Sequence, residues 1–301
     1  CTMKILITGG SGLLGSALTK KILKNNIEVV HLTRNKSSKN DVKNYLWNWE
    51  KNEIDENCFI GVTHIVHLAG AGIAEKAWTK KRKEHIVKSR VLTTRLMHSK
   101  ITELNLPISA FISASAVGIY GAQLSEKVFN EEDKPFEDFM GNCCKQWERS
   151  VNKFETISRV VKLRLGVILD KNHGALPRIA NMVKNGIGSP LGDGQQYMPW
   201  IHIEDAVTIF FNSIKNEKIS GTFNAVSSDY ITNSELTKKI GEVFNKKIWL
   251  PNVPSFVLKF LYGEMSDTIL KGVKVSNKKL KEIELKLKYE KIEDALSEIY
   301  S

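Results

Sequence analysis

The stretch that most constrains the fold lies near the start of the chain, where KILIT is followed at once by GGSGLLG. Lys4–Thr8 is apolar and rich in β-branched residues, which predicts a buried strand. Residues 13–23 then carry apolar side chains at helical spacing. The glycines therefore join a strand to a helix, and glycine allows the tight turn and close helix–strand packing that such a join requires.

Strands and helices continue to alternate as far as Leu165. Further strands are predicted at Glu28–Thr33, 63–68, 110–115 and 160–165, with helices at 78–104 and 138–154. This order predicts an α/β fold, namely a Rossmann doubly wound parallel sheet with right-handed crossovers and helices on both faces.

The alternation loosens after Gly166. A Gly- and Pro-rich loop over 186–199 precedes a strand that runs into a helix, and from Asn233 the sequence is mostly helical and basic. We therefore predict a Rossmann domain over 3–230 and a smaller, mostly helical C-terminal lobe over 231–301. The basic ending also contains apolar residues that favour packing against the main body: Leu280, Ile283, Leu285, Leu287 and Tyr289.

Composition excludes several classes of partner. The net charge is +11, but the lysines are scattered among acidic residues and form no Arg-rich stripe with aromatic residues, so nucleic acid is not expected. No apolar run reaches transmembrane length, so no membrane partner is expected. The four cysteines, Cys1, Cys58, Cys143 and Cys144, lack the spacing of a zinc site. Their pattern predicts no metal site and a cytoplasmic location.

The glycine-rich turn predicts a dinucleotide-binding site. Three glycines lie three residues apart, after a strand and before a helix, where a backbone can approach a pyrophosphate. Free N–H groups and the helix dipole favour an anion there. The predicted phosphate-binding residues are Gly9, Gly10, Ser11, Gly12, Leu13, Leu14 and Gly15.

The end of the second strand indicates which dinucleotide binds. An NAD site would place Asp or Glu there, to accept from the ribose 2′-hydroxyl. This chain has Thr33 and Arg34, followed by Asn35 and Lys36. A guanidinium beside a hydroxyl suits a 2′-phosphate, so NADP is the predicted cofactor.

Longer motifs resemble a known family. TGGSGLLG, VHLAG, FISASAVGIYG and PWIHIEDAV resemble extended short-chain dehydrogenase/reductases of the sugar-nucleotide epimerase type, over residues 3 to about 230. WNWE, GALPRI and the ending of the chain resemble an atypical epimerase-like subgroup that ends in a small domain of unknown function. The resemblance implies further residues at the cofactor groove: Leu68, Ala69, Gly70, Arg90, Ser113 and Ile168.

The chain departs from the usual members of that family at the acid/base pair. They carry Tyr-x-x-x-Lys on the helix at 138–154, whereas this chain has Met140 and Cys144 at those positions. Met140 cannot transfer a proton, and Cys144 cannot supply a fixed positive charge. Ser115, Tyr120 and Cys144 are the remaining catalytic candidates, and Arg90 could bind a phosphate or a substrate carboxylate.

The adjacent cysteines in FMGNCCKQWE have two readings. Met140, Cys143, Cys144, Trp147, Val151 and Phe154 form one apolar stripe at helical spacing, which favours packing. The alternative is a thiol at Cys144 that faces the cofactor. Downstream, His202 is expected to be structural, and Asp205 is expected to cap a helix.

Two functions are compatible with this sequence. One is an oxidoreductase or epimerase-like enzyme with a non-standard acid/base, acting on a small molecule whose identity the sequence does not specify. The other is a non-catalytic NADP(H)-binding regulatory or sensor protein. Related proteins often dimerise through the helices at 78–104 and 138–154, so a homodimer is a further expectation.

Overall fold

A computed structural model describes residues 3–35 and 42–301, and Cys1 and Lys36 lie outside the described residues. The α/β class and the parallel sheet are confirmed. Within the described chain the central sheet has eight strands, in the order β11-β8-β6-β5-β1-β2-β3-β4. The strands are β1 (Lys4–Thr8), β2 (Glu28–Thr33), β3 (Lys43–Asn48), β4 (Glu53–Ile54), β5 (His64–His67), β6 (Ala110–Ala116), β8 (Arg159–Leu165) and β11 (Gly221–Ala225).

The sheet is parallel except where β4 pairs antiparallel to β3. Central strand β1 lies between β2 and β5, with Ile7 opposite His31 on one side and Val66 on the other. Ile5, Leu6 and Ile7 are fully buried, as expected for a strand covered on both faces.

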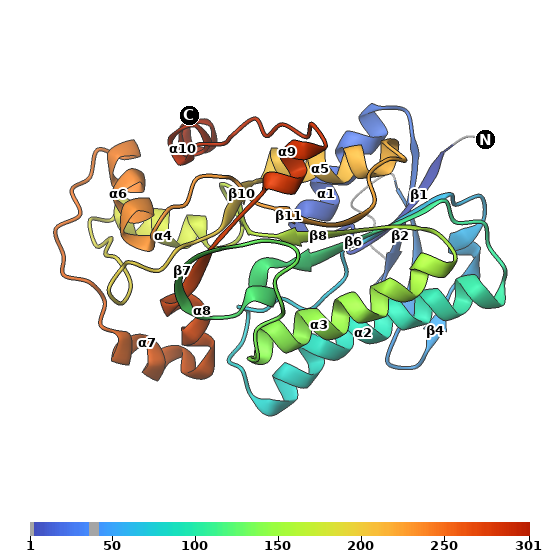
Figure 1. The fold of residues 1–301 in the computed structure, drawn as a ribbon, viewed down its shortest axis with the longest axis horizontal. Coiled ribbons are helices and arrows are strands. Elements are labelled where there is room, and N and C mark those ends of the chain that lie inside the picture. The colour runs from blue at the N-terminus through green and yellow to red at the C-terminus, as the bar shows by residue number, and fades with distance from the viewer. Residues whose placement is uncertain (1–2, 36–41) are drawn as a thin grey trace.

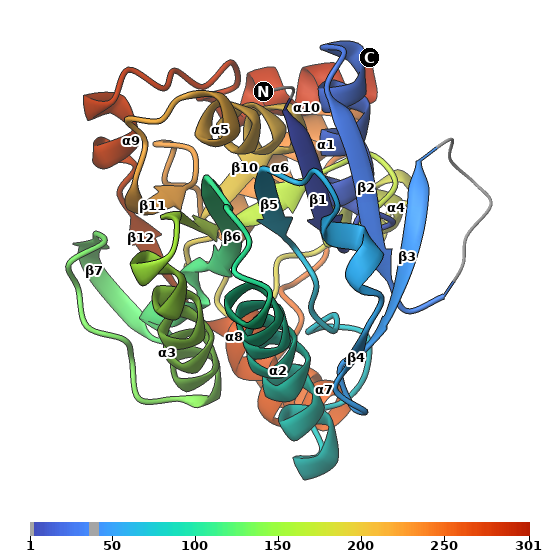
Figure 2. The ribbon, with the colours of Figure 1, turned by 90° about the vertical axis from the view of Figure 1, so that its right-hand side faces the viewer.

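Helices cover both faces of the sheet (Figure 2). Helices α1 (Leu13–Lys24) and α5 (Ile203–Lys215) pack together on one side. Helices α2 (Lys80–Glu103) and α3 (Phe139–Val151) pack together on the other. The predicted helix at 138–154 is shorter than expected, because a 3₁₀ turn, η3 (Asn152–Thr156), follows Val151.

A second apolar cluster lies beyond the sheet, on the left of Figure 1. It joins the short parallel pair β9 (Val167–Leu169) and β10 (Trp200–His202) to three helices from the second half of the chain. Those helices are α4 (Leu176–Lys184), α6 (Asn233–Val243) and α10 (Ile292–Tyr300).

The end of the chain also returns to the main body. Strand β12 (Gly272–Val275) pairs in parallel with β7 (Leu124–Phe129), an insertion between β6 and α3. Leu280 and Leu285 are buried in the main core, which confirms the predicted packing of the basic ending. The remaining elements are α7 (Ser255–Tyr262), α8 (Asp267–Leu270), α9 (Lys278–Glu282), η1 (Glu56–Phe59), η2 (Val117–Tyr120) and η4 (Gly263–Ser266).

Parallel order brings the carboxyl ends of β1, β2 and β5 to one edge of the sheet, where open α/β folds bind ligands. Within the described residues, no helix is both long enough and apolar enough to cross a bilayer.

Candidate functional site

The turn after β1 is held by its glycine backbone. Gly9 has φ +71°, and its carbonyl oxygen accepts from Gly12 N at 3.1 Å. A Cβ at Gly15 would lie 2.2 Å from that same oxygen, so α1 can start this close to β1 only with glycine there. Gly10 packs against the ring of His31, which a Cβ would approach to 2.5 Å.

Gly12 differs from its neighbours. It is exposed, it is the N-cap of α1, and no side chain caps that helix. A Cβ at Gly12 would contact Gly9 O at 3.4 Å and no closer atom of the described protein, so packing leaves room for a side chain. The free N–H groups of α1 open onto this space, which fits a phosphate that approaches the backbone closely.

Arg34 and Thr33 lie at the end of β2, as predicted. The Thr33 hydroxyl donates to Asn35 O at 2.8 Å. Arg34 is exposed, and in the described part of the chain no carboxylate pairs with its guanidinium. The structure therefore leaves a cation at the strand end where NAD-specific sites carry an acid.

A cavity of about 260 Å³ follows this edge of the sheet. An adjoining groove of about 590 Å³ continues over β3 and β4, and Arg34 lines both. Trp47, Trp49 and His85 also line both, although sequence reasoning did not assign them to the site. The signal for the two tryptophans was the WNWE motif, noted only as a family resemblance, whereas His85 lies outside that motif.

Trp49 and His85 form an aromatic wall. Their ring centroids are 5.6 Å apart and the planes are inclined at 48°. Aromatic faces beside an arginine suit a purine ring next to a phosphate.

Beneath the cavity, His67 at the end of β5 is fully buried. Its Nδ1 lies 2.8 Å from Thr8 Oγ1, and its Nε2 lies 3.1 Å from Thr94 Oγ1. Burial, reinforced by the charge of Arg90, lowers the pKa of His67 to about 3. The imidazole is therefore neutral and joins β1, β5 and α2 below the site.

The predicted apolar stripe on α3 faces inward. All six of its residues are buried: Met140, Cys143, Cys144, Trp147, Val151 and Phe154. Burial raises the pKa of both cysteines, for Cys144 far above the ordinary thiol value. Both thiols are therefore protonated and poorly nucleophilic. The interpretation that Cys143 and Cys144 pack in the core fits these surroundings.

Arg90 lies between the two helices that cover this face. It is 8% exposed, its Nη1 donates to Ile86 O at 3.0 Å, and its guanidinium carbon lies 5.1 Å from the ring centre of Trp147. A Cβ on Gly70, which lines the cavity, would lie 3.0 Å from that carbon. Burial lowers the pKa of Arg90, and none of the described carboxylates pairs with it. A buried cation without a counter-ion directly behind the cavity wall can hold an anionic ligand.

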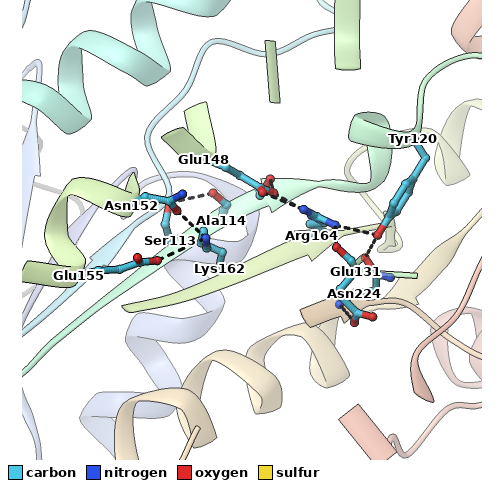
Figure 3. A network of polar contacts seen from close by, with 11 residues as sticks. Ser113, Ala114, Tyr120, Glu131, Glu148, Asn152, Glu155, Lys162, Arg164 and Asn224 are labelled. Atoms are coloured by element: carbon cyan, nitrogen blue, oxygen red, sulfur yellow. Dashed lines mark hydrogen bonds and ion pairs between the residues drawn. The ribbon is translucent and has the colours of Figure 1, made fainter. Parts of the chain in front are cut away.

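Ser115 and Tyr120 belong to one buried polar network. Figure 3 shows its central part, with Arg164 between Glu148 and Tyr120. Arg164 on β8 forms a two-pronged ion pair with Glu148 on α3, at 2.8 and 2.9 Å. Ser115 Oγ donates to the same carboxylate at 2.6 Å. On the other side, Arg164 Nη1 donates to the Tyr120 hydroxyl at 3.0 Å.

The surroundings of Tyr120 make it a weak proton donor. Its side chain is fully buried and its hydroxyl donates to Asn224 Oδ1 at 2.7 Å. Burial raises the pKa of Tyr120 to about 12, although Arg164 opposes the shift. Ser115 is also buried, and its proton is engaged by Glu148.

The structure brings part of the predicted cofactor set into the cavity wall. Members that line it are Gly9, Ser11, Gly12, Thr33, Arg34, Leu68, Ala69 and Gly70. Others do not line it: Gly10, Leu13, Leu14, Gly15, Arg90, Ser113 and Ile168. Ser113 is fully buried and donates to Ala114 O, whereas Ile168 lies in β9 and packs against the main core.

The predicted capping role of Asp205 is wrong. His202 is the N-cap of α5, where its Nδ1 accepts from Glu204 N at 3.2 Å. The carboxylate of Asp205 instead accepts from the backbone N–H groups of Lys288 and Tyr289, at 2.7 and 3.0 Å. Its partners come from a distant part of the chain, which local spacing cannot show.

In the described part of the chain, no group of three His, Cys, Asp or Glu residues is arranged to hold a metal ion.

In comparison with known proteins, two family models match this chain. One, described as the NAD dependent epimerase/dehydratase family, matches residues 5–225. The other, described as a domain of unknown function (DUF1731), matches residues 253–299.

Curated relatives match along the whole chain. The epimerase family protein YfhF of Bacillus subtilis strain 168 is 34% identical over 301 residues, covering 99% of this chain and 98% of the relative. The chloroplastic homologue of epimerase family protein SDR39U1 from Arabidopsis thaliana is 33% identical over 307 residues, covering 99% and 86%. A crystal structure of human epimerase family protein SDR39U1 (isoform 2) with NADPH has TM-score 0.88 and 26% identity, covering 99% of each chain.

Proposed function

Because the chain belongs to the NAD-dependent epimerase/dehydratase family, we propose that it binds NADP(H) at the carboxyl edge of its sheet. We propose further that it acts there on a small molecule, as an epimerase-like oxidoreductase. The family assignment agrees with the resemblance predicted from the sequence motifs.

The observation that carries the choice of cofactor is Arg34. It stands exposed at the end of β2, pairs with no carboxylate among the described residues, and lines both parts of the groove. A guanidinium in this position can pair with a 2′-phosphate, whereas an Asp or Glu would repel one. The NADPH in the human relative's structure supports the same choice.

The cradle at Gly12 fits the rest of the cofactor. The N-terminus of α1 would hold the pyrophosphate, Arg34 the 2′-phosphate, and Trp49 with His85 would border the adenine. Leu68 and Gly70 would line the nicotinamide half, with Arg90 behind them. NADP(H), when bound, supplies hydride transfer, and these residues would bind it, orient it and exclude water.

A second function is favoured by a different observation, which is the surroundings of the usual acid/base positions. Met140 and Cys144 are buried, and Tyr120 and Ser115 are fixed in the Arg164 network. None of these four groups presents a free acid or base to the cavity. We therefore keep, as the alternative, a non-catalytic NADP(H)-binding protein that senses or regulates.

Cofactor choice can be tested with Arg34→Ala. We expect the unaltered protein to bind NADPH more tightly than NADH, and the variant to lose most of that preference. A charge-assisted contact contributes roughly 1.5–3 kcal/mol, which is about a 10- to 150-fold change in affinity. Calorimetric titration with both cofactors measures it, with Arg34→Lys as a control that keeps the charge but not the two-pronged geometry. Equal NADPH and NADH affinities in the unaltered protein would contradict the assignment.

A ligand screen separates enzyme from sensor. Thermal-shift measurements with NADPH present would identify small molecules that raise the melting temperature further. Hits would then be assayed for oxidation of NADPH or for epimerised product. Stabilisation by a metabolite without turnover would favour the sensor.

A further inference from the structure

Helix α7 exposes the face that helices normally bury. Phe256 is 73% exposed, Phe260 is 90% exposed and Leu261 is 60% exposed, whereas Leu258 on the opposite side is buried. Phe256 and Phe260 are one turn apart, so they form a single apolar ridge with Leu261 beside it. In both views α7 lies at the lower edge of the molecule (Figures 1 and 2).

Basic residues border this ridge. Lys83, near the start of α2, forms an ion pair at 2.7 Å with Glu264, which follows α7. That contact places the start of α2, with its run of lysines, next to α7. Segments 75–84 and 255–271 together contain seven basic and four acidic residues.

Every acid in these two segments already has a partner. The pairs are Glu75 with Arg82, Glu84 with Lys88, Glu264 with Lys83 and Asp267 with Lys271. In the described structure, Lys76, Lys80, Lys81 and Lys259 form no ion pair. The charged side chains of these two segments that are left without an ion pair are therefore all lysines.

The positive charge of these lysines indicates which kind of partner could cover the ridge. A second copy bound through the same face would bring its own unpaired lysines against these, and like charges repel. Exposed aromatic residues rimmed by lysine are instead typical of helices that lie in the surface of an anionic bilayer.

We propose that α7 and the start of α2 form a docking surface for an anionic membrane. Phe256, Phe260 and Leu261 insert among the lipid chains at the headgroup boundary, and the unpaired lysines contact the lipid phosphates. The proposal replaces the sequence-based expectation that no membrane is a partner, and it does not depend on the proposed reaction.

Vesicle sedimentation tests the proposal with the full chain. We expect binding to vesicles of phosphatidylcholine mixed with phosphatidylglycerol, and weak binding to phosphatidylcholine alone. The double substitution Phe256→Ser with Phe260→Ser should reduce binding to the mixed vesicles by roughly tenfold or more. Lys80→Ala and Lys81→Ala should each reduce it roughly fivefold, and added salt should reduce it as well.

Ile60→Ser is the matched control. Ile60 is 65% exposed, but it precedes the amino end of β5, at the sheet edge opposite the one from which the chain leads into α2. This variant should sediment like the unaltered protein, and circular dichroism with thermal denaturation of every variant reports whether its fold is kept.

Three results would overturn the proposal: equal sedimentation of the unaltered and double variants, equal binding to neutral and mixed vesicles, or no vesicle binding combined with a dimer that the double substitution abolishes. The last result would assign the ridge to a second copy. A failure to bind NADPH, by contrast, would count against the proposed function and not against this surface.

Discussion

At the scale of single residues, the glycines of the turn between β1 and α1 are constrained by different neighbours. Gly9 has a left-handed backbone, and Gly15 has no room for a Cβ beside Gly9 O. Gly12 has room within the protein for a side chain, so we expect its lack of one to serve a ligand outside it. The sequence motif predicts that all three positions need glycine. Only the geometry shows that Gly9 and Gly15 are constrained within the protein, whereas Gly12 is not.

That separation makes Gly12→Val a clean test of the site. We expect the variant to keep its fold, with a modest loss of stability because valine is a poorer N-cap than glycine, but to lose NADPH binding, because the branched side chain would fill the space of the pyrophosphate. Calorimetric titration and chemical denaturation measure the two effects. Gly15→Ala is the contrasting change and should lower the free energy of unfolding. Unchanged NADPH affinity in folded Gly12→Val would mean that the phosphate lies elsewhere.

Cys144 on α3 and Arg90 on α2 are both buried, but we expect them to differ in role. Cys144→Ser should cost about 1–3 kcal/mol of stability, because the hydroxyl finds an apolar site, and NADPH affinity should stay within a few-fold. Arg90→Ala should instead weaken cofactor or substrate binding, since its cation has no counter-ion within the described protein. Denaturation and NADPH titration on both variants test this. Loss of turnover or of NADPH binding in Cys144→Ser would place the thiol in the active site.

At the scale of elements, the sequence predicted those strands whose residues form a clear local pattern, and it missed contacts between distant segments. Strands β1 and β2 have the predicted bounds, because a buried parallel strand is a continuous apolar run between turns. Strand β7 was missed because it is mostly exposed and pairs with β12, about 150 residues later, so neither strand alternates clearly. The polar network was also missed, since Glu148 and Arg164 pair across α3 and β8.

The contact of Asp205 with the backbone near the end of the chain can be tested by its effect on stability. Asp205→Ala would leave the backbone N–H groups of Lys288 and Tyr289 without their acceptor, and each unsatisfied group costs about 1–3 kcal/mol. We expect chemical denaturation to show a loss of about 2–5 kcal/mol. Glu204→Ala, which removes a partly exposed ion pair with Lys288, should cost less than about 1 kcal/mol. Similar losses in both variants would mean that Asp205 does not hold the C-terminal segment.

At the scale of the whole molecule, the apolar core also encloses histidines that stay neutral. The main core extends from β1 to Leu280 and Leu285, so the C-terminal segment is part of it. Within this core the histidines of the central strands are shielded from water. Burial lowers the pKa of His31, His64 and His67, and for His67 the value falls to about 3.

These histidines predict how unfolding depends on pH. Above pH 6.5, the ordinary value, His67 is neutral in both states and its contribution is fully present. Between pH 6.5 and about 3 the unfolded chain takes up a proton that the folded protein does not, so stability falls on acidification. The slope approaches about 1.4 kcal/mol per pH unit for this one group.

His67→Asn isolates that contribution. The variant should be less stable at neutral pH, because the bonds to Thr8 and Thr94 are disturbed, but its stability should fall less steeply toward pH 5. Most carboxylates titrate below pH 5, the lower end of this comparison. Asp205, whose pKa burial raises, acts in the opposite direction in both proteins alike. The difference between the two slopes, measured by denaturation at several pH values, therefore reports His67. Parallel lines would mean that the imidazole is protonated in the folded protein and that its neutral role beneath the cofactor groove is wrong.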